Sequence, residues 1–128
     1  MHFLKALLES ERIGARAFAD IGRAADLHIA DLIFDCELAQ GAICVLLKKA
    51  IVARGGTDTF RYKNTTVMPR AKCSLQELIA FARSNQIKMA DMIEEAVVNI
   101  FDSKLNAKLV YLLLLHRKQV EQLETLLA

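Results

Sequence analysis

The stretch of residues 74–101 decides the fold class, because it reads SLQELIAFARSNQIKMADMIEEAVVNIF without a single Gly or Pro. It opens with Ser74 and has Glu77 three residues later, the pair that forms a capping box at the start of a helix. Its apolar residues recur at alternating spacings of three and four, the period of an amphipathic helix. The stretch therefore predicts a helix from residue 74 to about 101.

Three further stretches have the same period and predict helices over about 3–25, 27–54 and 103–127. We expect Asp26 to cap the second of these helices, Gly55 and Gly56 to end it, and Asp102 or Ser103 to cap the last. No Pro marks the boundary at Asp26, so one helix of about fifty residues is the alternative there.

Length and composition predict a single all-helical domain over residues 1–128. A hydrophobic content of 54% is enough for a core, while one Pro and five Gly are too few for a fold with many turns. The formal net charge of +2 gives no reason to expect nucleic acid as a partner. Three cysteines without a CxxC pair and the lack of a long apolar run predict a cytoplasmic protein without a membrane segment.

The lengths of the connections predict the topology. The first two helices are joined tightly, as are the last two, so each pair is an antiparallel hairpin. Residues 55–72 lie between the pairs, and 18 extended residues reach about 60 Å, more than the length of a helix of about 25 residues. The sequence therefore predicts a four-helix bundle with a long crossover between helices two and three.

Four polar residues interrupt the apolar seams, one in each predicted helix and within about one turn of the same height. They are Glu11, Glu37, Gln86 and His116. A buried carboxylate without a partner costs several kcal/mol, so this layer must supply hydrogen bonds, a proton or a metal ion.

The architecture and the inward polar residues resemble the ferritin-like superfamily of ferritins, rubrerythrins and other di-iron carboxylate proteins. The opening residues 7–12, LLESER, with residues 14–16, GAR, resemble one of its bacterial subfamilies of unassigned function. That superfamily places a Glu on helices one and three and a Glu-x-x-His on helices two and four. Matched onto this sequence, the six ligand positions are Glu11, Glu37, Gln40, Gln86, Leu113 and His116.

The resemblance implies a degenerate di-iron site, because Gln40, Gln86 and Leu113 replace three of the six ligands. Two carboxylates in place of four do not balance two divalent cations. One expectation is a single Fe, Mn or Zn ion on the remaining ligands. The other is a metal-free network in which the glutamines donate to the carboxylates. The remaining ligands are Glu11, Glu37 and His116.

These observations favour a non-catalytic or residually metal-binding protein, and they assign no catalytic residue. Two alternatives stay open. One is a mononuclear Fe or Mn oxidoreductase that uses Glu11, Glu37 and His116. The other is a helical homo-oligomeric module for protein interaction. The second helix and residues 110–115 carry more apolar side chains than one seam needs, which favours a homodimer over coverage by the crossover.

Overall fold

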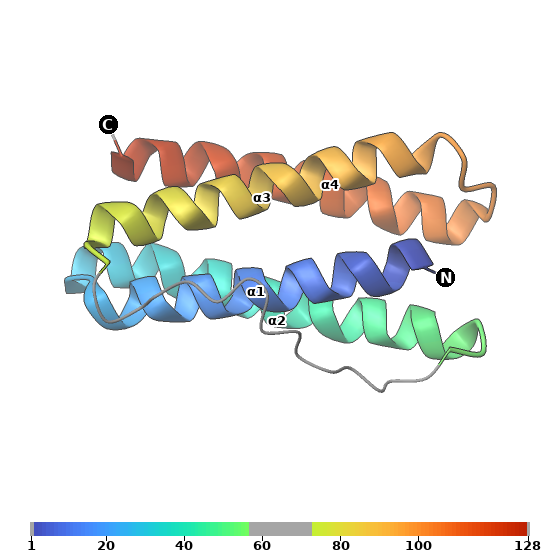
Figure 1. Cartoon of the computed structure of the whole chain (residues 1–128), viewed down its shortest axis with the longest axis horizontal. Helices are drawn as coiled ribbons and strands as arrows, with labels where there is room; N and C mark the ends of the chain where they lie inside the picture. Colours follow the sequence, from blue (N-terminus) through green and yellow to red (C-terminus); the bar gives the residue numbers. More distant parts are fainter. Residues whose placement is uncertain (1, 57–72, 128) are drawn as a thin grey trace.

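Four helices run side by side along one long axis (Figure 1), in the computed structural model that describes residues 2–56 and 73–127. They are α1 (His2–Ala24), α2 (Leu27–Ala53), α3 (Leu75–Val97) and α4 (Ser103–Leu127). The end of α2 and the start of α3 lie at opposite ends of the bundle. This is the predicted all-α architecture with a long connection between helices two and three. Of the predicted crossover 55–72, only residues 55 and 56 are among those described.

The predicted caps are present at the helix starts. The side chain of Asp26 accepts a hydrogen bond from Ile29 N at 3.1 Å at the start of α2. Ser74 and Glu77 form the reciprocal capping box of α3, with N–O distances of 3.2 and 3.1 Å. After the end of α2, Gly55 has a φ of 81°, which favours glycine because it has no Cβ.

The turn between α3 and α4 is held by two side chains. Asp102 Oδ1 accepts from the backbone N–H groups of Lys104 and Leu105, both at 3.1 Å, and so caps α4. Nδ2 of Asn106 donates to the carbonyls of Val97 and Ile100 at 2.8 and 3.1 Å. α3 therefore ends at Val97, about four residues earlier than expected, since Asn106 satisfies carbonyls that a longer helix would have bonded itself.

The apolar core is divided into two halves along the bundle. One half contains Leu7, Leu47, Ile93 and Leu109 from the four helices, all fully buried. The other half contains Phe18, Ile33, Ile79 and Leu123. Around the bundle, α1 packs on α2 and α3, and α3 packs on α4, while the contact between α2 and α4 is sparse.

The inward face of α2 lies one residue earlier in register than the periodicity suggested. Its buried positions are Ile33, Cys36, Gln40, Ile43, Leu47 and Ile51. Glu37, which was expected to point inward, is half-buried, and so is Cys44 on the same side of the helix, while Phe34 is exposed. The reason is that α2 is apolar on its outer face as well, so two different faces of the helix match the apolar period. None of the helices described has the length and apolar character needed to cross a membrane.

Candidate functional site: a polar layer in the bundle core

A layer of four polar side chains separates the two halves of the core. Each helix contributes one of them: Glu11 from α1, Gln40 from α2, Gln86 from α3 and His116 from α4. All four are completely buried, with an exposed fraction of 0%. We call these four residues the polar layer. A fully buried carboxylate and imidazole require partners, and the layer supplies them from within itself.

Hydrogen bonds close the polar layer into a ring. Nε2 of Gln40 donates to Glu11 Oε1 and, at 3.0 Å, to the backbone carbonyl of Glu11. Nε2 of Gln86 donates to Gln40 Oε1 at 3.2 Å. Nδ1 of His116 lies 2.5 Å from Gln86 Oε1, and its Nε2 lies 2.6 Å from Glu11 Oε2. Every side chain of the ring is bonded to the next one.

The direction of these hydrogen bonds follows from the backbone carbonyl of Glu11. A carbonyl oxygen only accepts, so the Gln40 atom that faces it is the NH2 group. Gln40 then presents its oxygen to Gln86, which must donate to it through its own NH2 group. This leaves the oxygen of Gln86 facing Nδ1 of His116, so Nδ1 carries a proton.

One proton is therefore shared between His116 Nε2 and Glu11 Oε2. With the proton on nitrogen the contact is an ion pair, and with the proton on oxygen it is a neutral hydrogen bond. In both cases the two groups together have no net charge, which removes most of the cost of burying an isolated carboxylate.

Side chains next to the polar layer fix the spacing of the helices. Nδ2 of Asn85 donates to the backbone carbonyl of Ser10 at 3.2 Å and so joins α3 to α1. Gly14 leaves room for this approach, because a Cβ there would lie 3.1 Å from Asn85 Nδ2 and 3.1 Å from Gln40 Nε2. Oε1 of Gln119 lies 3.3 Å from Nδ1 of His116. Gln119 was not among the predicted site residues, although it follows His116 by three positions on the same helix face.

The structure brings together Glu11 and His116 from the predicted ligand set, and it leaves Glu37 half-buried one turn from Gln40. Two residues considered as replaced ligands, Gln40 and Gln86, are members of the ring. The third, Leu113, is half-buried and packs against the core half that contains Leu109.

The residues of the polar layer do not fit a di-iron centre. Such centres use four carboxylates, and the layer has one, accompanied by one imidazole and two neutral amides. Both carboxylate oxygens of Glu11 and both ring nitrogens of His116 already have partners. Within residues 2–56 and 73–127, no three side chains of His, Cys, Asp or Glu lie together as a metal-binding group. Binding of one ion by Glu11, Glu37 and His116 stays a prediction.

Two cysteines on α2 lie near the polar layer and have raised thiol pKa values. Burial raises the pKa of Cys36 to about 11, and the nearby charge of Asp35 acts in the same direction. Burial also raises the pKa of Cys44 to about 11, with a further contribution from Glu11. Both thiols are therefore protonated at neutral pH, which makes them weak nucleophiles and weak metal ligands.

The fold of the chain is a ferritin-like four-helix bundle. The chain is similar to a ferritin-like diiron-carboxylate protein from Bacillus anthracis str. Ames, with a TM-score of 0.83 over 99% of this chain and 94% of that chain. The sequence identity is 16%, so the likeness concerns the fold. Residues 1–125 match the model of DUF6306, a domain of unknown function, and the chain belongs to that family. Among curated proteins, none matches the sequence.

Proposed function

We propose that this protein is a non-catalytic ferritin-like bundle in which the hydrogen-bonded polar layer takes the place of a metal centre. The closed ring through Glu11, Gln40, Gln86 and His116 carries this proposal. A metal ion would have to break the hydrogen bond between Glu11 and His116 and displace the shared proton. It would gain one carboxylate and one imidazole as ligands, which is a poor set for Fe, Mn or Zn.

The polar layer has a structural role in this proposal. It joins α1 to α4 and α2 to α3, the two helix pairs with the least direct packing on each other. A purely apolar core would allow several helix arrangements, whereas a buried polar network is satisfied in only one of them. The layer therefore specifies which helices face each other, and the helix surfaces remain available for partners.

Metal content tests the proposal. The protein is purified without a tag, offered Fe(II), Mn(II) and Zn(II) separately, freed of excess metal and measured by inductively coupled plasma mass spectrometry. We expect no ion above the background found for His116→Ala. About one ion per chain that disappears in both Glu37→Ala and His116→Ala would contradict the proposal. That result would support the mononuclear oxidoreductase, and reactivity with dioxygen or peroxide would then be the next measurement.

Self-association is the second candidate function, and the outer face of α2 favours it. Five large apolar residues on this face are exposed by 52% or more: Leu27, Phe34, Leu38, Val45 and Val52. Their spacings of seven, four, seven and seven residues keep them on one line along the helix. We call this line the α2 stripe. Gly41 lies in the middle of it with nothing within 4 Å of its Cβ position, so a second helix can approach closely there. An exposed stripe of this length fits a second copy of the chain.

Light scattering coupled to size-exclusion chromatography tests the self-association. We expect the mass of two chains for the wild type and of one chain for Leu38→Glu, since a charge in the α2 stripe would be buried in the dimer. Phe101→Glu is the matched control, because Phe101 is 91% exposed and lies outside α2. A wild-type protein that stays monomeric at high concentration would contradict self-association. It would not bear on the role of the polar layer.

A further inference from the structure

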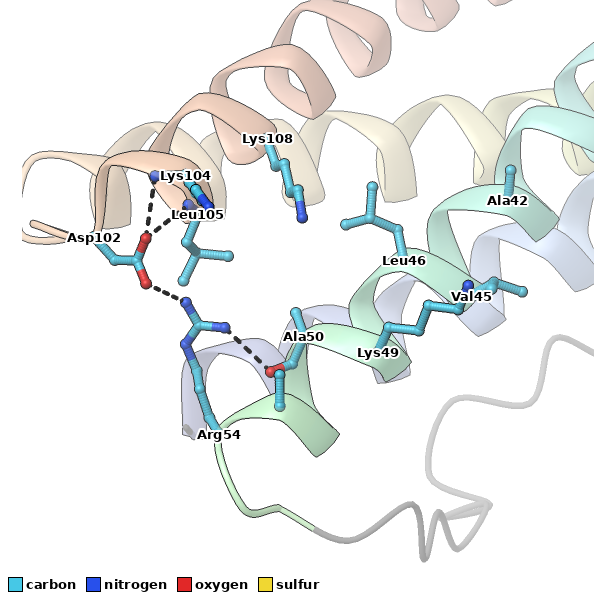
Figure 2. A pocket seen from close by; sticks show the side chains of 11 residues that line it. Ala42, Val45, Leu46, Lys49, Ala50, Arg54, Asp102, Lys104, Leu105 and Lys108 are labelled. Carbon is cyan, nitrogen blue, oxygen red and sulfur yellow. Dashed lines mark hydrogen bonds and ion pairs between the residues drawn. The ribbon is translucent and has the colours of Figure 1, made fainter.

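The sparse contact between α2 and α4 leaves a groove at the end of the bundle where α2 ends and α4 begins (Figure 2). Its volume is about 580 Å³, in the range of small-molecule binding sites. Three alanines of α2 that line it, Ala42, Ala50 and Ala53, are too small to fill the space between the helices. We call this space the α2–α4 groove.

The inner side of the α2–α4 groove is apolar. Leu46 of α2 is half-buried, and Leu105 of α4 is buried with an exposed fraction of 7%. In Figure 2, Leu46 points from α2 into the space between the helices, and Leu105 faces the same space from α4. An alkyl chain laid against these side chains would leave water, and burial of its apolar surface would favour binding.

The rim of the α2–α4 groove is basic. Lys49 from α2 and Lys104 and Lys108 from α4 line it, together with Arg54. Arg54 is neutralised by Asp102, whose Oδ2 lies 2.7 Å from its Nη2. Within the described part of the chain, the three lysine side chains form no ion pair or hydrogen bond. The groove thus has an excess of three positive charges, while the whole chain has a net charge of only +2.

Asp102 determines where along the rim an anion can bind. Its carboxylate already caps the N-terminus of α4 and pairs with Arg54, so the start of α4 is closed to a second anion. Lys108 lies one turn beyond Lys104 along α4, and Figure 2 shows its ammonium group directed into the space between the helices, beside Leu46. The open anion position is therefore beside Lys108, next to the apolar side chains, while the Lys49 ammonium lies beside Val45.

We infer that the α2–α4 groove binds an anionic amphiphile, a molecule with one carboxylate or phosphate head group on a single alkyl chain. The head group would lie beside Lys108, and the chain would lie along Leu46 and Leu105. The size of the groove favours a small molecule, because a stable protein interface needs about 800 Å² on each partner. This inference is independent of the polar layer, which lies deeper in the bundle.

Isothermal titration calorimetry with dodecanoate and with dodecyl phosphate, each below its micelle concentration, tests the inference. We expect both to bind with one site per chain, and the tighter of the two identifies the head group. Lys108→Glu should weaken binding by about tenfold or more, because a favourable charge contact becomes repulsive. The matched control Lys88→Glu reverses the charge of an exposed lysine of α3 and should change the affinity less than twofold.

A second variant separates the alkyl chain from the head group. Ala50→Phe leaves the lysines in place and fills the groove, so it should abolish binding while the helix content measured by circular dichroism is retained. Leu38→Glu, in the α2 stripe, should leave binding unchanged. Absence of binding by both amphiphiles would overturn the inference. Binding that survives the lysine reversal and Ala50→Phe but is lost in Leu38→Glu would also overturn it and assign the amphiphile to the α2 stripe.

Discussion

His116 of α4 and Glu11 of α1 meet across the centre of the bundle, with 2.6 Å between Nε2 and Oε2, although 105 positions separate them in the chain. α1 packs on α2 and α3, so this contact crosses the bundle diagonally. Each of the two groups is fully buried and is the other's partner at that atom. The stability of the fold should therefore depend on both groups being present together.

Removal of the imidazole should leave the Glu11 carboxylate without its partner. We expect His116→Ala to lower the free energy of unfolding by about 3–5 kcal/mol, measured by urea denaturation followed by circular dichroism. Glu37→Ala is the control, because Glu37 is half-buried and lies outside the ring, and it should change the value by less than about 1 kcal/mol. Equal losses in the two variants would show that the contact between His116 and Glu11 adds no more to the free energy of unfolding than the Glu37 side chain does.

Removal of both partners should cost far less than the sum of the single removals. In Glu11→Leu with His116→Leu, neither a carboxylate nor an imidazole remains buried alone, and two leucines restore apolar packing. We expect the loss for the double variant to be about 2 kcal/mol or more below the sum for Glu11→Leu and His116→Leu. A double-mutant cycle in urea measures this coupling, and additive losses would argue against a paired interaction.

Two glycines of α1 provide a matched test of the packing around the polar layer. A Cβ at Gly14 would lie 3.1 Å from Asn85 Nδ2 and from Gln40 Nε2, both held by hydrogen bonds. Gly14→Ala should therefore destabilise the protein by about 1–3 kcal/mol, measured as a shift of the urea midpoint. At Gly22 the nearest atom is Ile33 Cγ2 at 3.8 Å, so Gly22→Ala should stabilise the helix by about 0.5–1 kcal/mol. A stabilising Gly14→Ala would mean that the polar layer can shift to make room.

Much of the fold was predictable from sequence, because the caps and the apolar period act locally. The predicted helix ends are present in the structure at Asp26, at Ser74 with Glu77, and at Gly55. The end of α3 at Val97 depends on Asn106, a side chain of the next helix, and its local sequence gives no sign of it. Local signals therefore determine the starts of the helices, and tertiary contacts determine this one end.

The polar layer could be predicted in part. Glu11, Gln86 and His116 interrupt helices with a clear inner face, and all three are buried as expected. The member from α2 is Gln40 and not Glu37, because α2 is apolar on two faces and either face matches its apolar period. Only packing against α1, where Gly14 leaves space for Gln40, determines which face points inward. The periodicity of α2 alone does not contain that information.

Acid should weaken the turn between α3 and α4. The pKa of Asp102 is lowered by the hydrogen bond from Leu105 N and by the charge of Arg54. A lowered pKa stabilises the fold above the ordinary aspartate value of 3.8, and this stabilisation is lost as pH falls through the folded-state pKa. Asp102→Asn should therefore unfold at lower urea than the wild type at pH 7, with a difference that shrinks below about pH 3.8. The control Glu95→Gln, at an exposed site on α3, should show no such trend. A difference that persists unchanged at low pH would contradict this role.

The thiols on α2 should react slowly in the folded protein. Burial raises the pKa of Cys36 and Cys44 to about 11 from an ordinary 9.0, so both have much less thiolate at pH 8 than a free cysteine. We expect iodoacetamide to alkylate these two residues at least about tenfold faster in urea than in the native state, as measured by peptide mass spectrometry. Fast native labelling of Cys44 would show that the region beside Glu11 opens to solvent.

The protonation of the His116 ring tests the central claim most directly, and nitrogen-15 NMR of the uniformly labelled protein measures it. The closed ring predicts a protonated Nδ1 whose hydrogen exchanges slowly with water, because it is buried and bonded to Gln86. It also predicts that the signals of both ring nitrogens stay in place when Zn(II) is added. An unprotonated Nδ1, or ring signals that move on addition of one equivalent of Zn(II), would contradict a closed hydrogen-bonded layer and favour a metal site.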